Sequence, residues 1–344
     1  MRAPTKIIIA CLALVAAAPR AHAQTIADIA AYTGPDRTQR LIDGARREGV
    51  VSLYSSAVID DTAAISGAFE KKYGVKVLLW RGSSEDILRR AVTEHRAGRH
   101  DVDVAETAGP DMEGLQREKL LQQMSSPLFA ELIPQAVSPQ RAWVTERLSI
   151  FTAGFNTTLI TPADAPRSYE DLTDPKWNGK LGIEADDANW FMSVVGAMGA
   201  DKALPLFRSI VARNGMSVRK GHTLLSNLVA AGEVPLGLTV YGYRIEELKS
   251  KGAPIDGVLI PPVVALPTGI AVFAKAPHPN AAALFMDFFL SDGQRILLER
   301  GNVPTNRTVK ALPAGLTLVD VPKFLDEGDK WTKLFKEVFA SGAR

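Results

Sequence analysis

The chain has almost no cysteine, since Cys11 is the single thiol among its 344 residues. One cysteine excludes a disulfide framework and any zinc or iron–sulfur site built from several thiolates. An excess of positive charge is also missing, because 40 Lys and Arg stand against 38 Asp and Glu. We therefore expect no nucleic-acid partner. Beyond the N-terminal segment, no apolar run approaches the ~20 residues of a transmembrane helix.

Familiar catalytic and nucleotide-binding motifs are absent as well. The sequence contains no G-x-S-x-G, G-x-x-x-x-G-K, H-E-x-x-H or G-x-G-x-x-G. His95 and His100 stand among arginines, which is typical of a solvated helix surface. Nothing local therefore indicates an enzyme. A secreted hydrolase with a serine–histidine pair stays open, because triad members are distant in sequence.

The N-terminus has the three parts of a secretory signal peptide. Arg2 and Lys6 form a basic region, residues 7–18 are apolar, and Ala21-His22-Ala23 is an A-x-A cleavage pattern. A lipoprotein cut just before Cys11 would leave too short an apolar run ahead of it. We expect cleavage after Ala23 and an exported, soluble, cysteine-free mature chain.

The remaining sequence alternates short apolar strands with amphipathic helices. Asp60 begins one predicted helix and Gly74 ends it, while Ser83 and Ser84 cap the next. The predicted strands cover residues 51–54, 75–79, 102–105, 180–184, 216–219 and 234–240, with helices between them. This alternation predicts an α/β fold with parallel sheets. The extended apolar segments 148–155 and 269–274 are the predicted crossings between two α/β halves, for which the length leaves room.

Several short motifs occur in an order that resembles one family. They are Val51–Ser56, Asp101–Glu106, Lys176–Ile183, Leu236–Tyr243 and Ala276–Ala282, the last followed by residues 285–294. Over some 250 residues this order resembles the soluble binding component of an ABC importer. More narrowly, the chain is similar to the ferric-ion-binding group of family 1 extracellular solute-binding proteins.

The resemblance implies a type II periplasmic-binding-protein fold, a two-lobed clamp with a ligand cleft between the lobes. We expect a signal peptide at 1–23, a discontinuous first lobe of residues 24–156 and 262–344, and a second lobe of residues 157–261. The resemblance further implies a periplasmic monomer that needs no cofactor and catalyses no reaction. It would close on a small ligand and deliver it to an inner-membrane ABC permease and its ATPase.

The family's iron site uses a histidine, a glutamate and two adjacent tyrosines. By resemblance, Glu106 matches the glutamate, and Tyr241 and Tyr243 match the tyrosines with Gly242 between them. Fe(III) prefers anionic oxygen donors, by the logic that gives hard cations carboxylate shells. We therefore expect Glu106, Tyr241 and Tyr243 to be metal ligands and Fe(III), free or chelated, to be the transported ligand. Where the family has its histidine, this chain has apolar residues near Ala57.

For several further candidate residues, the sequence allows either a ligand-binding role or a structural role. Asp187 either faces the ligand or caps a helix, and His222 either replaces the missing imidazole or caps the helix that follows. Trp190 is either an aromatic wall or a core residue. The hydroxyl groups at the strand and helix ends, Ser55, Ser56 and Ser83, complete the candidate set, although helix capping also explains Ser83.

A second function remains open for the same clamp. Its ligand is then a small organic solute, such as a polyamine, an organic acid or a phosphonate. The run Tyr241-Gly242-Tyr243-Arg244, together with Trp190, would act as an aromatic and ionic cradle. A carboxylate that faces the ligand at Asp187 would repel phosphate or carbonate and would suit a cation or an amine.

Overall fold

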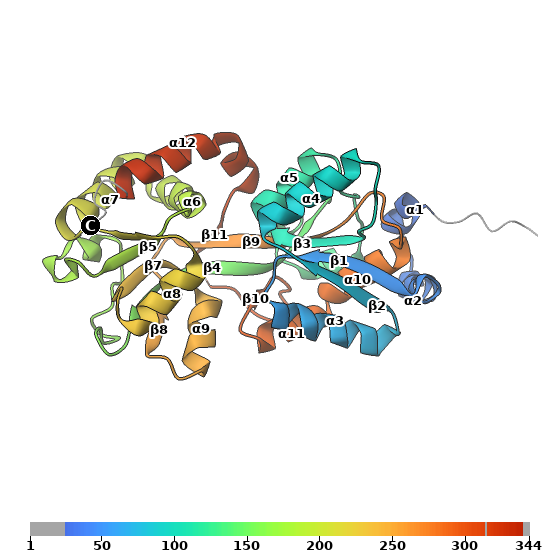
Figure 1. Cartoon of the computed structure of the whole chain (residues 1–344), viewed down its shortest axis with the longest axis horizontal. Coiled ribbons are helices and arrows are strands. Elements are labelled where there is room, and N and C mark those ends of the chain that lie inside the picture. The colour runs from blue at the N-terminus through green and yellow to red at the C-terminus, as the bar shows by residue number, and fades with distance from the viewer. Residues whose placement is uncertain (1–24, 314, 340–344) are drawn as a thin grey trace, which may run out of the picture.

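Two α/β lobes are joined by two long strands in the computed structural model, which describes residues 25–313 and 315–339 (Figure 1). The joining strands, β4 (Val144–Asn156) and β9 (Val263–Val272), pair with each other in antiparallel orientation. They contain most of the apolar segments that the sequence predicts as crossings. The predicted α/β class and the two-lobed architecture are confirmed.

The elements follow the predicted alternation of strands and helices. The strands are β1 (Val50–Ser55), β2 (Lys76–Arg81), β3 (Val104–Ala108), β4, β5 (Leu181–Glu184), β6 (Ser217–Arg219), β7 (Leu236–Tyr241), β8 (Ile255–Val258), β9, β10 (Val303–Pro304) and β11 (Leu316–Leu318). The helices are α1 (Ile26–Ala31), α2 (Arg37–Glu48), α3 (Ile59–Tyr73), α4 (Ser84–Arg96), α5 (Gly109–Arg117), α6 (Ala188–Met198), α7 (Ala200–Asn214), α8 (His222–Ala231), α9 (Gly242–Ser250), α10 (Pro279–Phe289), α11 (Asp292–Glu299) and α12 (Val321–Phe339). Gly74 ends α3 as predicted, in the left-handed conformation at φ 75°.

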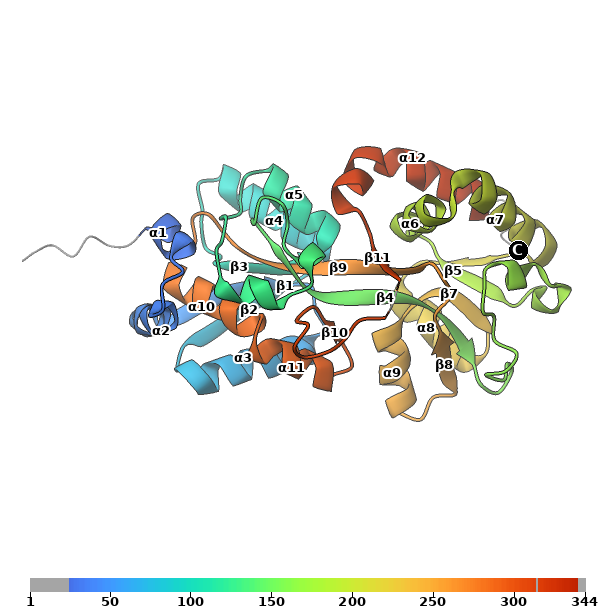
Figure 2. The same cartoon turned by 180° about the vertical axis from the view of Figure 1, so that it is seen from behind.

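The first lobe is a sheet covered by helices on both faces. Its strand order is β2-β1-β3-β9-β4, and β1 runs parallel to both of its neighbours. Helices α4 and α5 cover one face, while α2, α3, α10 and α11 cover the other (Figures 1 and 2). Aromatic packing holds the helices of the second layer together, since Phe69 of α3 meets Phe285 of α10 edge-on with ring centroids 5.0 Å apart.

The second lobe repeats this layered arrangement on the other half of β4. The strand order continues as β4-β7-β5-β6, and β5 is parallel to both β6 and β7. Helices α6, α7 and α12 cover one face and α8 and α9 cover the other (Figure 2). The carboxyl ends of β5 and β7 therefore lead directly into loops and helices that carry the candidate site residues.

The C-terminal helix corrects one predicted boundary. The sequence places residues 321–339 in the first lobe, whereas α12 packs its apolar face on α6 and α7 of the second lobe. The Phe339 ring lies 5.2 Å from that of Phe191 and 5.7 Å from that of Phe207. These contacts place the aromatic rings of α12 in the core of the second lobe. The second lobe, like the first, is therefore built from two separate stretches of the chain.

The N-terminal predictions concern residues outside the described part of the chain. The signal peptide, its cleavage after Ala23 and Cys11 all fall within residues 1–24, which the structure does not describe. Among residues 25–313 and 315–339, every helix is too short or too polar to cross a membrane.

The role of α12 in the second lobe is tested by Phe335→Ala. Phe335 is 2% exposed and packs against Phe191 and Phe339. Loss of a buried phenyl ring is expected to reduce the free energy of unfolding by about 3–5 kcal/mol, measured by urea denaturation. Its exposed neighbour is the control: Lys336→Ala should stay within about 0.5 kcal/mol of the parent. Equal effects of the two substitutions would show that α12 is not part of this core.

Candidate functional site

Two tyrosines stack where β7 ends and α9 begins. Tyr241 is the last residue of β7, and Tyr243 lies in the first turn of α9. Their ring centroids are 5.6 Å apart and their planes differ by 19°. Within the described part of the chain, neither phenol hydroxyl has a hydrogen-bond partner. We call Tyr241 and Tyr243 the tyrosine pair; it presents two phenol oxygens that a ligand can bind.

Charges from both lobes surround the tyrosine pair. Arg147 and Asp61 of the first lobe act on Tyr243, whereas Asp187 and Glu184 of the second lobe act on Tyr241. Burial raises the pKa of both phenols, and the negative charge of Asp187 raises the pKa of Tyr241 further. The pair therefore lies at the boundary between the lobes and stays protonated unless a strong positive charge stabilises the phenolate.

Glu106, the predicted carboxylate ligand, belongs to a buried charge network in the first lobe. It is 1% exposed, and its Oε1 accepts a 2.6 Å hydrogen bond from Arg147 Nη2. Its Oε2 accepts a hydrogen bond from Ser55 Oγ. Arg147 Nη1 also donates to Glu146 Oε1 at 2.7 Å. One guanidinium thus neutralises much of the charge on two buried carboxylates.

Strand register brings these network residues together. Across β9, Glu106 of β3 lies opposite Ile270 and Arg147 of β4 lies opposite Thr268. Because these two β9 residues are two positions apart, Glu106 and Arg147 point to the same face of the sheet. Glu106 and Glu146 hold the pKa of Arg147 above its ordinary value although burial opposes the charge.

Sequence reasoning misses Arg147 and Glu146. The available signal is a pair of opposite charges directly before the apolar crossing segment at 148–155. Charged residues at the start of a buried strand need partners, because an unpaired buried charge is very costly. The identity of the partner depends on strand register, which the sequence does not reveal.

Three titratable residues of the second lobe converge beneath Tyr241. Glu184 ends β5, Asp187 precedes α6 and His222 begins α8. One ligand atom from each of these residues lies within 4.8 Å of the others. The His222 ring lies 4.0 Å from the Tyr241 ring, centroid to centroid. We call Glu184, Asp187 and His222 the second-lobe cluster.

Hydrogen bonds determine the orientation of the His222 ring. Its Nδ1 lies 3.1 Å from the carbonyl oxygen of Thr239, and since a carbonyl only accepts, Nδ1 carries a proton. Its Nε2 faces Asp187 Oδ1 at 3.3 Å. Burial opposes the charge of this imidazole, but the carboxylate of Asp187 prevails and raises the pKa of His222 to about 9.

The capping alternatives for Asp187 and His222 are wrong. Asp187 occupies the N-cap position of α6, yet its side chain makes no capping hydrogen bond. Gly221, not His222, is the N-cap of α8, and the imidazole bonds to Thr239 of β7 instead. The two side chains instead turn toward each other, with His222 Nε2 3.3 Å from Asp187 Oδ1. Neither is used as a cap, so both are available for a ligand. Glu184, which sequence reasoning treats only as a strand end, joins them.

Two other predicted ligand contacts have structural roles. Trp190 is 1% exposed and packs edge-on against Tyr169 and Phe207 in the core, so it is not the aromatic wall that the sequence allows. The Ser83 hydroxyl caps α4 by accepting a 3.1 Å hydrogen bond from the Asp86 amide.

The serines after β1 differ from each other. Ser55 is completely buried, and its hydroxyl is committed to Glu106. Ser56 is half-buried, and its amide donates to the Glu106 carbonyl oxygen. Ser55 therefore positions the carboxylate of Glu106, while Ser56 keeps an available hydroxyl at the end of the strand.

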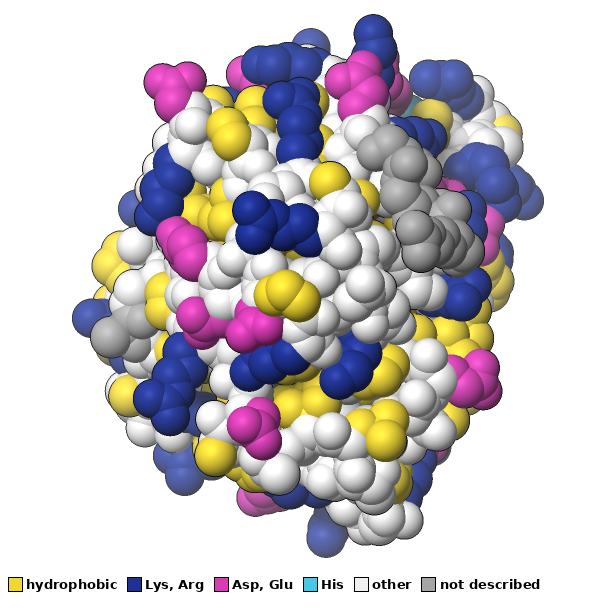
Figure 3. All heavy atoms as spheres, turned by 90° about the vertical axis from the view of Figure 1, so that its left-hand side faces the viewer, with side chains coloured by type: hydrophobic (Ala, Val, Ile, Leu, Met, Phe, Trp, Pro, Cys, Tyr) yellow, Lys and Arg dark blue, Asp and Glu magenta, His cyan; other side chains and the backbone are white. Residues whose placement is uncertain are grey.

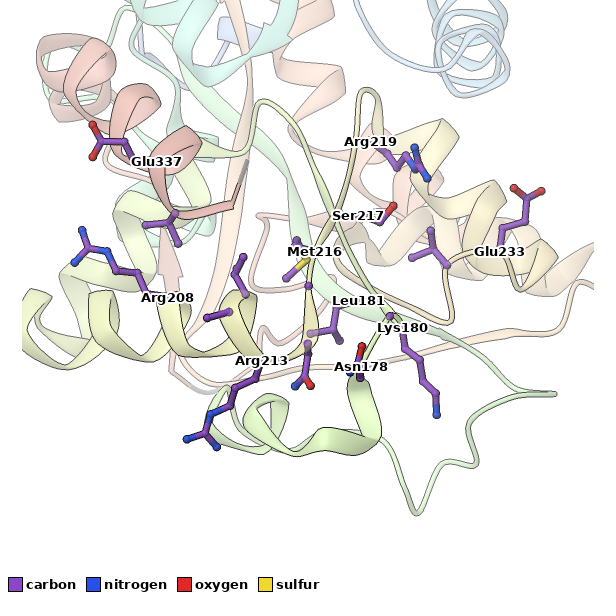
Figure 4. Close-up of a pocket in the computed structure, with 17 residues that line it drawn as sticks. Asn178, Lys180, Leu181, Arg208, Arg213, Met216, Ser217, Arg219, Glu233 and Glu337 are labelled. Atoms are coloured by element: carbon purple, nitrogen blue, oxygen red, sulfur yellow. The ribbon is translucent and has the colours of Figure 1, made fainter. Parts of the chain in front are cut away.

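A hollow of about 750 Å³ lies elsewhere, at the outer end of the second lobe between α7 and β6. Its lining includes Lys180, Arg208, Arg213 and Arg219, and the side chains of Lys180, Arg208 and Arg213 extend away from its centre (Figure 4). On this end of the molecule, basic and acidic side chains are interspersed (Figure 3). The hollow shares no residue with the tyrosine pair or the second-lobe cluster. Its open, outward-facing charges form no cradle for a ligand.

The chain matches the description of one protein family and is similar to several known proteins. The family described as bacterial extracellular solute-binding protein matches residues 56–296. The chain is 25% identical to iron uptake protein A1 of Synechocystis over 289 residues, 75% of this chain and 78% of that protein. It is 24% identical to the Fe(3+)-binding periplasmic protein of Serratia marcescens over 243 residues, 67% of this chain and 70% of that protein.

A solved structure shares the fold of this chain over almost the whole length of the solved protein. The periplasmic binding protein AfuA of Actinobacillus pleuropneumoniae, with fructose-6-phosphate bound, superimposes with a TM-score of 0.69. The superposition covers 85% of this chain and 99% of AfuA, at 22% sequence identity. At this identity the likeness concerns the fold, so the ligand has to be argued from the residues of the site.

The Asp187–His222 pair is tested by Asp187→Asn in chelator-treated protein. Without the negative charge, burial dominates, and the titration midpoint of His222 should fall from about 9 by about one pH unit or more, as followed by NMR. Because the folded-state pKa is raised, the stability that the pair contributes is complete below pH ~6.5 and is lost as the pH rises through about 9. The variant should lack this pH dependence.

The matched control for this substitution is Asp186→Asn, since the Asp186 side chain is 65% exposed and lies outside the second-lobe cluster. It should leave the His222 midpoint unchanged. An unaltered midpoint in Asp187→Asn would show that Asp187 does not hold the proton on His222.

Proposed function

Because this chain belongs to the family of bacterial extracellular solute-binding proteins, we propose that it binds ferric iron between its lobes as the periplasmic component of an ABC importer. In this proposal the first 23 residues are a signal peptide removed after Ala23, and the mature chain acts as a monomer. It catalyses no reaction and passes its ligand to an inner-membrane permease driven by an ATPase. The relatives named for iron uptake and Fe(3+) binding support this ligand.

The observation that carries the proposal is the stacked tyrosine pair with two unpartnered phenol oxygens at the lobe boundary. Phenols in this environment ionise only beside a strong positive charge, because burial raises the pKa of both. Fe(III) supplies that charge and prefers anionic oxygen. The pair is thus suited to a small, highly charged cation.

Glu106 supplies a third oxygen in this proposal. Its Oε1 is held by the charged Arg147, whereas its Oε2 is held by the neutral hydroxyl of Ser55. The hydrogen bond to Ser55 is the weaker of the two and is the one exchanged for a metal bond. Contacts from both lobes to one ion then favour a closed arrangement of the lobes.

Ferric binding by these phenols depends on pH. Each tyrosine must release a proton when it becomes a ligand, so acidification favours the ligand-free form. We expect the apparent affinity for ferric citrate to fall by up to about tenfold per pH unit for each coordinating phenol. Fluorescence or absorption titrations between pH 8 and pH 6, in citrate buffers of constant chelating strength, measure this slope. An affinity independent of pH would contradict phenolate ligation.

Removal of the two hydroxyls tests the ligands directly. Tyr241→Phe combined with Tyr243→Phe should abolish the tyrosinate-to-iron charge-transfer band and reduce ferric affinity by at least about a hundredfold. Folding should be almost unchanged, because neither hydroxyl has a partner in the described residues. Tyr73→Phe is the control, since Tyr73 is a buried tyrosine of the first-lobe core. A double variant that keeps the band would place the iron elsewhere.

Among organic solutes, one specific observation favours an amine. The buried carboxylates of Glu184 and Asp187 lie near the aromatic ring of Tyr241, and such a setting attracts an ammonium group. The same carboxylates would repel an organic acid or a phosphonate. If the chelator-stripped protein stays colourless with ferric citrate while polyamines raise its melting temperature, the ferric proposal fails and the amine takes its place.

A further inference from the structure

The second-lobe cluster has features of a metal site that do not depend on the ferric proposal. Its three donors come from the ends of β5, the start of α6 and the start of α8, and they meet within 4.8 Å. We propose that Glu184, Asp187 and His222 form a binding site for a divalent transition-metal cation, with Zn²⁺ as the best match to the donors. Neither Glu106 nor Tyr243 takes part in it.

The orientation of His222 is that of a metal ligand. Its Nδ1–H donates to the Thr239 carbonyl oxygen at 3.1 Å, which leaves Nε2 as the atom that faces the Asp187 carboxylate at 3.3 Å. In metal sites the second ring nitrogen is commonly fixed in this way by a backbone carbonyl. The ring is further held by its contact with Tyr241, at 4.0 Å between centroids.

Glu184 is also held rigidly. Its Oε1 accepts the amide of Gly221 at 2.8 Å, and its Oε2 accepts the amide of Asp186 at 2.6 Å. A carboxylate oxygen that accepts one hydrogen bond keeps a second lone pair for a cation. Two backbone hydrogen bonds therefore position Glu184 without exhausting its capacity to bind.

Asp187 supplies an independent indication that the second-lobe cluster binds a ligand. Its side chain is 3% exposed, and its Oδ2 is buried without a hydrogen-bond partner among the described residues. A buried carboxylate oxygen with no partner is unfavourable, because it has lost water and gained nothing in exchange. A cation bound between Asp187, Glu184 and His222 removes this deficit.

Ligand type and spacing favour zinc. Ligands of a tetrahedral Zn²⁺ ion lie about 2.0–2.1 Å from the metal, which places them about 3.3 Å from one another. His222 Nε2 and Asp187 Oδ1 are already 3.3 Å apart. One imidazole and two carboxylates form a mixed nitrogen and oxygen set that suits Zn²⁺ and Co²⁺. The fourth position is left for water or for a group of the transported ligand.

The site is tested with Co²⁺ and Zn²⁺ on the untagged, chelator-stripped mature protein. We expect one equivalent of Co²⁺ to bind with visible d–d absorption of a low-symmetry site, and Zn²⁺ to displace it. Asp187→Asn and His222→Gln should each weaken Co²⁺ binding by about a hundredfold or more. His222→Gln keeps the test valid if Asp187→Asn fails to fold, because the His222 side chain is 23% exposed.

Two controls separate the cluster from other histidines and acids. Asp186→Asn changes an exposed neighbouring carboxylate, and His100→Ala breaks up the His95–His100 ring pair on the surface of the first lobe. Both variants should bind Co²⁺ as the parent does. Loss of binding in His100→Ala, with binding retained in Asp187→Asn, would overturn the proposal.

Tyr243→Phe distinguishes this site from the ferric site. We expect this variant to bind Co²⁺ with unchanged affinity while its ferric charge-transfer band is weakened. A parent protein that shows the ferric band but no Co²⁺ or Zn²⁺ binding overturns the divalent site alone. Co²⁺ binding without any ferric band overturns the ferric proposal and leaves the divalent site standing.

Discussion

Burial of negative charge at the lobe boundary is the constraint on which the site depends. Glu106, Glu146, Glu184 and Asp187 are each at most 3% exposed, and Arg147 and His222 are the cations that contact them. Burial raises the pKa of Glu146 and Glu184, which shows how unfavourable full ionisation is here. A bound cation would offset this buried negative charge. For that reason the structure favours a positively charged ligand over an anion.

The strands β4 and β9 connect the two lobes, so the site has a first-lobe side and a second-lobe side. Strand β4 belongs to both sheets, because it pairs with β9 in the first lobe and with β7 in the second. On the first-lobe side, their register sets Arg147 against Glu106. On the second-lobe side, the ends of β5 and β7 place Glu184 and the tyrosine pair. Relative movement of the lobes would change the distance between these two groups without disturbing either one.

Local patterns in the sequence predict the elements well, because caps and glycine stops act over a few residues. Ser83 and Gly74 are examples, and the crossing segments are recognisable as long apolar strands. Long-range packing is not encoded in this way. The place of α12 depends on rings more than 120 residues apart, such as Phe191 and Phe339, so proximity in the sequence assigns it to the wrong lobe. The role of Trp190 is equally ambiguous in the sequence, because an aromatic residue near a helix start can pack in the core or line a ligand site.

The sequence likewise predicts only those parts of the site that depend on local patterns. Tyr241, Tyr243, Asp187 and His222 lie at or just after strand ends, which the alternation of elements reveals. The pairing of Glu106 with Arg147 joins residues 41 positions apart and requires the strand register. The orphaned oxygen of Asp187 and the tautomer of His222 require atomic positions, and Glu184 gains meaning only beside them.

The most direct test of ferric binding by the tyrosine pair is anomalous diffraction from crystals of the mature protein grown with ferric citrate, measured on both sides of the iron absorption edge. The account predicts an iron peak within bonding distance of the hydroxyl oxygens of Tyr241 and Tyr243. Iron bound only by surface histidines, or density for an organic molecule between the lobes with no anomalous signal, would contradict it.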